Sequence, residues 1–211
     1  MTVQKGNDMD LTELKARLGS HAAEPIRPPR IVMASVLIPL LERDGAVQVL
    51  FEQRDARILQ GGEICFPGGH VEPGESPAEA AVRETAEELL LAPEQVELVA
   101  PLHIMSGHGT REIYSFLGIL HDYKDTRDPT EVAGTFTLPL DRLLSEPPLS
   151  CEGKIVVDPG EDFPYHLIPG GRNYPWMATP RKFYFYPSPH GTVWGLTAEF
   201  LTVFLDLLRG E

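Results

Sequence analysis

The segment from Gly69 to Leu91 constrains the fold of this chain most, because it joins a glycine-rich loop to one amphipathic helix. Ser76 and Pro77 predict the start of that helix, since serine caps helix N-termini and proline fits the first turn. A rotation of about 100° per residue then separates two faces. The apolar face comprises Ala78, Val82, Thr85, Ala86 and Leu89, and the opposite face carries Glu84, Glu87 and Glu88. We expect the first face to enter a core and the second to present clustered carboxylates.

The acidic face has two interpretations: a solvated helix surface or a site for a cation. A solvated helix usually interleaves Lys or Arg four residues from its acids. Here Glu84 and Glu88 form a like-charge i,i+4 pair, and Arg83 is the only nearby cation in the helix. Mg²⁺ or Mn²⁺ would relieve the repulsion, because hard cations take oxygen ligands. The spacing therefore favours a metal site.

The same segment resembles the Nudix box, the signature of hydrolases of nucleoside diphosphates linked to another group. The resemblance is carried by Gly69, five residues, Glu75, seven residues and then Arg83-Glu84-Thr85-Ala86-Glu87-Glu88. It implies that the three helical glutamates hold Mg²⁺ or Mn²⁺ and serve catalysis, with the Gly69 carbonyl as a further ligand and Glu84 as one candidate base. It also implies that Glu75 and Arg83 pair to fix the loop on the helix.

Two positions depart from the box. Thr85 stands where the family has a bulky aliphatic residue, which is a mild change. Leu90 stands where the family has a glycine. Because glycine is the usual residue of a left-handed helix end, we expect the helix to continue past Leu90 or to close differently.

Composition limits the classes of partner. At 211 residues the chain is long enough for one domain with a substantial core, and 42% hydrophobic and 23% charged residues are ordinary values. A net charge of −13 argues against a protein that coats nucleic acid, because such surfaces are basic. Phosphate recognition must therefore come from local cations and bound metal. Two cysteines make no disulfide framework, and no signal peptide or membrane span is recognisable, so we expect a cytoplasmic protein.

Residues 1–30 are expected to form an N-terminal helix and linker. Asp10 and Glu13 suggest a capping box, Gly19 suggests the helix end, and three leucines make one stripe for packing. Prolines predict an extended linker over 20–30.

Strand patterns then fill the chain up to a final helix. A buried central strand is expected at 31–41, turning at Asp44-Gly45 into a strand over 46–53. Further strands are expected at 64–71, 95–105, 112–121 and 131–138, followed by an extended segment over 146–191, and the last helix at 196–209 has Thr197 as its cap. This order predicts an α/β (α+β) protein with the Nudix fold over 31–211, a mixed β-sheet sandwiched between helices.

The flanks of the box sharpen the resemblance. Arg54 and Arg57 precede Gly-Glu-Ile-Cys-Phe-Pro-Gly-Gly, which is similar to the extra motif of the coenzyme A pyrophosphatase branch, as is the run from Trp194 to Ala198. The branch implies that the substrate is contacted by Arg54, Arg57, Gly68 and Gly69. The arginine guanidinium groups would bind phosphate oxygens. Arg57 is one residue out of register, and the arginines could instead be solvated loop cations. Cys65 lacks a nearby base and is interpreted as a small buried hydrophobe.

Three other features are left open by the sequence. The loop from Ser106 to Arg111 is either a substrate contact or an ordinary turn. Lys182 to Tyr186 is either an adenine-stacking surface or core and edge packing. A further metal-binding acid is frequent in the family, and Glu112, Glu131 and Glu161 are unranked candidates. The histidines lack metal-ligand spacing.

The resemblance implies metal-dependent hydrolysis of the diphosphate of coenzyme A or its derivatives, giving 4′-phosphopantetheine and adenosine 3′,5′-bisphosphate. An alternative substrate that is also compatible with the box is another small nucleoside diphosphate derivative, such as ADP-ribose or a dinucleotide. A non-catalytic nucleotide-binding module is a third alternative, although such a module would have lost the acidic residues. Neither nucleic acid nor membrane is expected as a partner, and a homodimer is one of the open oligomeric states.

Overall fold

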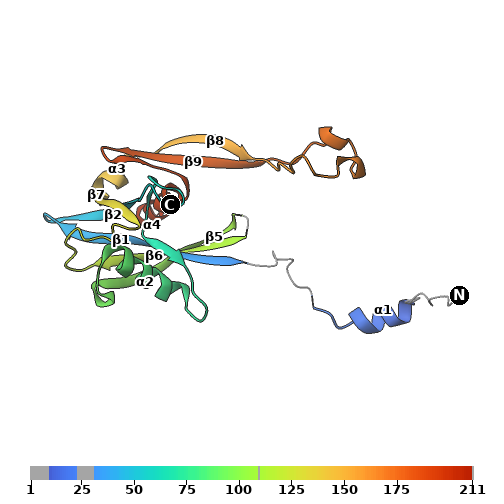
Figure 1. The fold of residues 1–211 in the computed structure, drawn as a ribbon, viewed down its shortest axis with the longest axis horizontal. Helices are drawn as coiled ribbons and strands as arrows, with labels where there is room; N and C mark the ends of the chain where they lie inside the picture. Colours follow the sequence, from blue (N-terminus) through green and yellow to red (C-terminus); the bar gives the residue numbers. More distant parts are fainter. Residues whose placement is uncertain (1–9, 23–30, 109, 211) are drawn as a thin grey trace. The chain divides into compact units, whose positions relative to one another are not determined.

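The computed structural model describes residues 10–22, 31–108 and 110–210 (Figure 1). The chain divides into two compact units, residues 1–31 and residues 32–211. No helix in the described part is both long and apolar enough to cross a membrane.

The first unit contains one short helix, α1 (Leu11–Leu18). The Asp10 side chain accepts a hydrogen bond from the Glu13 amide at 2.8 Å, which is the predicted N-cap. The Glu13 carboxylate instead binds Arg17 at 2.6 Å, so the reciprocal half of the capping box does not form. No residue of α1 is buried, and the leucine stripe therefore contributes no core to its own unit. Residues 1–9, and 23–30 of the predicted linker, lie outside the described residues.

The second unit is built on a seven-stranded mixed sheet. Its strands are β1 (Val32–Arg43), β2 (Ala46–Arg54), β3 (Ile64–Cys65), β4 (Gly68–His70), β5 (Val96–His108), β6 (Arg111–Leu120) and β7 (Val132–Pro139). The order is β3-β2-β1-β6-β5, with β4 also paired to β1 and β7 to β2. Only the β1–β6 pair is parallel among the pairings of this sheet. Asp44 and Gly45 both have positive φ, as the predicted hairpin turn requires.

A helix covers each face of this sheet. Helix α2 (Pro77–Leu89) lies on one face and α4 (Gly195–Arg209) on the other, as Figure 1 shows. The alternation of β1 sends Leu37 into the cluster with Leu89 of α2, and Ile38 into the cluster with Leu201 of α4. The predicted mixed sheet between helices is confirmed, and β1 is the buried central strand that its sequence predicts.

The remaining elements are short helices and three further strands. They are η1 (Pro93–Gln95), α3 (Leu140–Ser145), β8 (Leu149–Ile155), η2 (Tyr165–Leu167), η3 (Gly171–Asn173), β9 (Thr179–Ser188) and β10 (Gly191–Val193). Strands β8, β9 and β10 form a second sheet of three strands. Tyr186 of β9 is buried in the α4 cluster, where its hydroxyl lies 2.8 Å from that of Thr202. For this residue, core packing is the correct interpretation of the aromatic run.

The start of α4 differs from the prediction. Trp194, not Thr197, is the N-cap, and no side chain caps the helix. Gly195 adopts φ +65° and turns the chain from β10 into the helix, so Thr197 falls inside the first turn. The glycine, rather than a capping hydroxyl, sets the helix start.

The end of α2 also corrects the sequence interpretation. Leu90 adopts the left-handed conformation, with φ 52° and ψ 48°, and ends the helix at Leu89. Tertiary contacts hold this end: the Thr126 hydroxyl donates to the Leu89 carbonyl at 2.6 Å, and the Asp128 amide donates to the Glu88 carbonyl at 2.8 Å. The last carbonyls are therefore satisfied outside the helix, although a residue other than glycine in this conformation is strained.

We predict that Leu90→Gly is more stable than Leu90→Ala by about 0.5 to 1 kcal/mol in urea denaturation, because glycine adopts positive φ without strain. Leu90 is 57% exposed, so truncating its side chain removes little packing. The alanine variant is the matched control, because it loses the same side chain and keeps the strain. Equal stability of the two variants would contradict the assignment of strain to Leu90.

Candidate functional site

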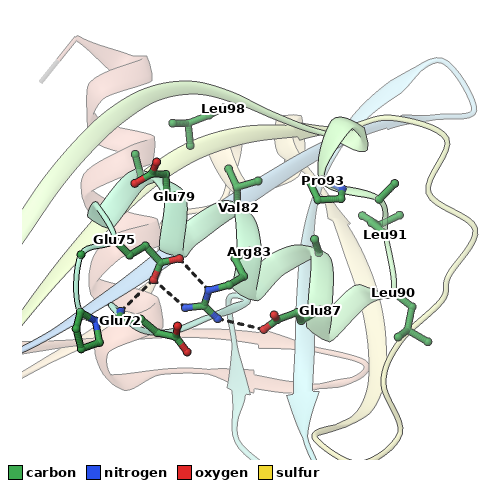
Figure 2. A pocket seen from close by; sticks show the side chains of 15 residues that line it. Glu72, Glu75, Glu79, Val82, Arg83, Glu87, Leu90, Leu91, Pro93 and Leu98 are labelled. Carbon is green, nitrogen blue, oxygen red and sulfur yellow. Dashed lines mark hydrogen bonds and ion pairs between the residues drawn. The ribbon is translucent and has the colours of Figure 1, made fainter.

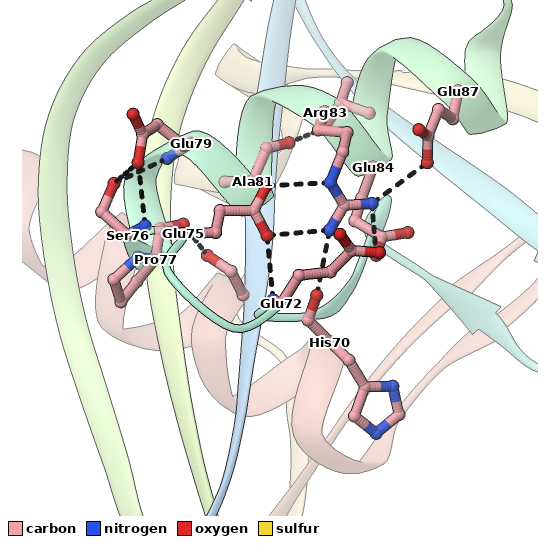
Figure 3. Close-up of polar contacts among 12 residues, drawn as sticks. His70, Glu72, Glu75, Ser76, Pro77, Glu79, Ala81, Arg83, Glu84 and Glu87 are labelled. Carbon is pink, nitrogen blue, oxygen red and sulfur yellow. Dashed lines mark hydrogen bonds and ion pairs between the residues drawn. The ribbon is translucent and has the colours of Figure 1, made fainter.

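A capping box fixes where α2 leaves the box loop. The Ser76 hydroxyl accepts from the Glu79 amide at 3.2 Å, and the Glu79 carboxylate accepts from the Ser76 amide at 2.8 Å (Figure 3). The predicted start at Ser76 and Pro77 is confirmed. With the start fixed, the helical rotation determines which glutamates turn towards the sheet.

Arg83 ties the loop to the helix. Its guanidinium makes two hydrogen bonds to Glu75, at 2.8 and 3.0 Å, in the bidentate geometry that suits arginine and carboxylate. It also donates to the His70 carbonyl at 3.1 Å. The same group binds Glu84 at 3.0 Å and Glu87 at 3.1 Å (Figure 3). Arg83 is therefore shared among the acidic residues of the box and holds the loop against α2.

Two glutamates of different elements are buried together beneath the helix. Glu88 of α2 is 5% exposed and accepts a hydrogen bond from the Gly68 amide at 2.9 Å. Glu52 of β2 is 1% exposed, and its Oε1 lies 3.3 Å from the Cys65 thiol. Its Oε2 has no hydrogen-bond partner in the described part of the chain. A buried carboxylate oxygen without a partner is costly and indicates a missing cation or proton.

Burial dominates the electrostatics of this cluster. Desolvation raises the pKa of Glu88, Glu52 and Glu84 above the ordinary carboxyl value, and repulsion from Glu52 raises the pKa of Glu88 further. The charge of Glu131 also raises the pKa of all three. Among the unranked candidates, Glu131 thus lies within electrostatic reach of the cluster. Burial and Glu52 likewise raise the pKa of Cys65, which keeps the thiol protonated as a donor rather than a nucleophile.

Gly68 and Gly69 let these carboxylates approach the backbone. A Cβ on Gly68 would meet the Ser35 carbonyl and the Val36 backbone of β1, and its φ is +153°. A Cβ on Gly69 would meet the Glu84 carboxylate. The first glycine therefore allows β4 to pair with β1, and the second leaves room for an acidic side chain.

A cavity of about 320 Å³ opens on the other side of these glycines. Arg54, Gly68 and Gly69 belong to its wall, together with residues of β1, β6 and the start of α4. The Arg54 guanidinium donates to the Leu59 carbonyl at 3.2 Å. Arg57 is not part of this wall; it binds the Asp55 carboxylate at 2.6 Å and the Pro129 carbonyl at 3.1 Å. The structure brings Arg54 to the glycine turn and leaves Arg57 on the neighbouring loop.

A second hollow, of about 1140 Å³, runs along the outer side of α2 (Figure 2). Apolar residues such as Val82, Leu91 and Leu98 line it, with Glu72, Glu79 and Glu87 around them. Val82 and Ala78 of the predicted core face are thus only partly buried, whereas Ala80 and Ala81 are fully buried. The acidic rim makes this groove a poor site for a phosphate group.

The model of the NUDIX domain family matches residues 32–155. The chain belongs to this family. It is 35% identical over 118 residues to Nudix hydrolase 3 of Caenorhabditis elegans, an alignment that covers 53% of this chain and 49% of that protein. It is 35% identical over 137 residues to the peroxisomal coenzyme A diphosphatase NUDT7 of Mus musculus, with 64% and 57% covered. The chain therefore spans about half the length of these relatives.

One solved structure is similar to part of this chain. The Nudix hydrolase RenU from M. smegmatis has a TM-score of 0.46 and 24% identity, over 53% of this chain and 73% of that one.

Nudix hydrolases generally require a divalent metal such as Mg²⁺ or Mn²⁺. In the residues described, no three His, Cys, Asp or Glu side chains are grouped as ready ligands. Glu84 and Glu87 are instead engaged by Arg83, and Glu87 is 61% exposed. The donor chemistry nevertheless fits a hard cation, because the carboxylates of Glu88 and Glu52 are desolvated and one oxygen of Glu52 is orphaned.

Glu52 is the residue that sequence reasoning missed. It lies two positions after Leu50 of β2, so the strand alternation turns it towards α2 like that leucine. A charged residue at an inward position of a buried strand was the available signal. Its partner across the ladder is Cys65, which belongs to the flanking motif.

We predict that in EDTA the free energy of unfolding falls as the pH rises from about 5 through the raised pKa of Glu88. The folded state binds that proton more tightly than the unfolded state, so stability is greatest when the group is protonated and is lost on ionisation. Glu88→Gln removes the buried charge, and we expect it to be more stable than wild type at pH 8 by on the order of 1 to 3 kcal/mol.

Denaturation curves at pH 5, 7 and 8 check this, with Glu146→Gln as a control at an exposed carboxylate. Mn²⁺ should raise the melting temperature of wild type at pH 8 and leave Glu88→Gln nearly unchanged. A glutamine variant with the wild-type pH slope would disprove the buried-charge account.

Alanine substitutions at Gly68 and Gly69 should differ in their effects on folding stability and on metal binding. Gly68→Ala forces a Cβ into the β1 backbone at positive φ, and we expect a loss of about 3 kcal/mol or more. Gly69→Ala meets a flexible carboxylate that can turn away, so we expect about 1 kcal/mol or less but weaker Mn²⁺ binding. Thermal unfolding and metal titration calorimetry measure both effects. Equal destabilisation by the two variants, or unchanged metal affinity in Gly69→Ala, would be the contrary result.

Proposed function

We propose that this protein hydrolyses the diphosphate of coenzyme A or its derivatives, giving 4′-phosphopantetheine and adenosine 3′,5′-bisphosphate. The observation that carries the proposal is the acidic cluster of the buried Glu52 and Glu88 and the partly buried Glu84 around the Gly68–Gly69 turn, with Arg54 in the wall of the cavity beside that turn. Anion-binding and cation-binding groups thus meet at one stretch of backbone, as hydrolysis of a metal-bound diphosphate requires.

Each residue of the box has a distinct task in this reaction. Glu84, Glu87 and Glu88 would hold Mg²⁺ or Mn²⁺, and Glu52 adds a carboxylate oxygen beside them. A bound divalent cation would neutralise the diphosphate and lower the pKa of the attacking water. Arg54 would hold a phosphate oxygen through its guanidinium. Glu75 and Arg83 support the loop that carries Gly69, and a carboxylate of the cluster accepts the proton of the water.

The choice of coenzyme A is supported by the mouse relative, whose name describes a coenzyme A diphosphatase. The flanking motifs of the sequence support the same substrate. We also infer a reducing compartment, the cytosol, which agrees with the unpaired state of Cys65 and Cys151.

The proposal is tested with a panel of substrates in Mg²⁺ or Mn²⁺: coenzyme A, acetyl-coenzyme A, ADP-ribose and diadenosine polyphosphate. We expect adenosine 3′,5′-bisphosphate by mass spectrometry from the first two, and a kcat at least about 100-fold lower in Glu88→Gln, because a metal ligand is lost. Glu146→Gln is the surface control. Cleavage of ADP-ribose with coenzyme A untouched would refute the substrate, and near wild-type activity in Glu88→Gln would refute the metal site.

A further inference from the structure

The cavity beside the glycine turn is enclosed by two layers of the protein. Its floor comes from β1, β4 and β6, and its roof from Trp194 to Thr197 and Phe200 at the start of α4. The register places Ser35 of β1 opposite Gly69 of β4 and Tyr114 of β6. The floor is therefore continuous from the glycine turn to β6. A ligand that enters beside Arg54 can extend across the sheet towards Arg111.

Arg111 is a cation of this cavity that no carboxylate of the described residues neutralises. It is the first residue of β6, pairs with Val32 of β1, and faces the same side as the buried Ile113 two positions on. Its guanidinium has no hydrogen bond or ion pair with any residue that the structure describes. Most described arginines are paired, as Arg43 is with Asp125, in a chain of net charge −13. An unpaired arginine in a cavity wall suits an anionic ligand group.

Trp194 supplies an aromatic surface to the same cavity. It is 48% exposed although it stands between the buried strand residue Val193 and the first turn of α4. Gly195 sets its place through a positive φ, and the ring stacks on no other aromatic ring among the described residues. Half-exposed tryptophan on a cavity wall is a stacking platform for a nucleobase.

We propose that this cavity is a subsite for a phosphorylated purine nucleoside, in which Trp194 stacks on the base and Arg111 binds a phosphate on the ribose. This inference rests on the proposed function and deepens it: coenzyme A carries adenine and a 3′-phosphate in addition to its diphosphate. The diphosphate is assigned to the acidic cluster and Arg54. Arg111 is a separate cation for the 3′-phosphate, which ADP-ribose and diadenosine polyphosphates lack.

Tryptophan fluorescence tests the subsite without requiring catalysis. The chain has two tryptophans, so Trp176→Phe leaves Trp194 as the only tryptophan, and excitation at the red edge of the indole band avoids the tyrosines. In EDTA, we expect adenosine 3′,5′-bisphosphate to quench this emission saturably, at least about tenfold more tightly than 5′-AMP. Arg111→Gln should reduce that preference to less than about twofold. Arg142→Gln, which loses an exposed ion pair, is the matched control and should retain it.

Steady-state kinetics supply a second measurement. Trp194→Ala and Arg111→Gln should each raise KM for coenzyme A about tenfold and leave kcat within about twofold, since neither residue touches the diphosphate. For dephospho-coenzyme A, which lacks the 3′-phosphate, Arg111→Gln should change KM by less than about twofold.

The outcomes separate this inference from the proposed reaction. Selective binding of the bisphosphate without coenzyme A hydrolysis would refute the reaction and support the subsite. Hydrolysis without quenching, or with the preference retained in Arg111→Gln, would refute the subsite and leave the reaction standing. Circular dichroism and melting temperature confirm that each variant is folded.

Discussion

The burial of Glu88 against the Gly68 amide is the contact on which the candidate site depends. A carboxylate removed from water needs hydrogen bonds and a countercharge, and the protein supplies one backbone donor and places a second buried carboxylate, Glu52, beside it. This arrangement exists only because α2 begins at Ser76 and because the turn at Gly68 lacks a side chain. The apolar side of α2 anchors it through Ala81 and Leu89 in the sheet cluster. Packing energy thus holds an electrostatically unfavourable cluster in place.

The acidic and basic parts of the site are divided by backbone. Arg83 is saturated by Glu75, Glu84, Glu87 and a carbonyl, so it has no free hydrogen-bonding capacity for a phosphate. Arg54 lies beyond the glycine turn and pairs with no carboxylate within 4.0 Å among the described residues. A strongly acidic protein can therefore offer an anion site, because local cations outweigh its net charge at close range.

The parts of the fold that depend on short-range chemistry could be predicted from sequence. Ser76, Pro77 and Glu79 specify a helix start through their own hydrogen bonds, and Asp44-Gly45 specifies a hairpin through its backbone preferences. Leu90 could not be predicted, because Thr126 and Asp128 capture the carbonyls at the end of α2 from a distant loop. Thr197 has a capping side chain, but the positive φ of Gly195 fixes the helix start three residues earlier.

The site shows the same division between local and tertiary information. The helical period alone brings Glu84, Glu87 and Glu88 to one side of α2, so this part of the site could be predicted from the sequence. The helical period does not predict the exposure of each side chain. The sheet buries Glu88, whereas Glu87 remains in solvent with Arg83. Glu52 joins them only because β2 lies beneath α2, a relation between residues 36 positions apart. Which glutamates of such a box could bind a metal ion therefore depends on their burial as much as on their spacing.

The run from Trp194 to Ala198 positions the start of α4, a role that its resemblance to the coenzyme A pyrophosphatase branch does not by itself explain. Gly195 is required for the backbone conformation, Ala198 is buried and closes the first turn onto the Trp194 carbonyl, and Leu196 packs on the α4 cluster. Each of these residues positions the helix, and none of them presents a polar side chain to the cavity. Trp194 is the member of the run whose large side chain remains half exposed there. The surrounding residues therefore hold one aromatic ring at the wall of the cavity that Arg111 also lines, so the nucleoside subsite that we propose is separate from the acidic cluster.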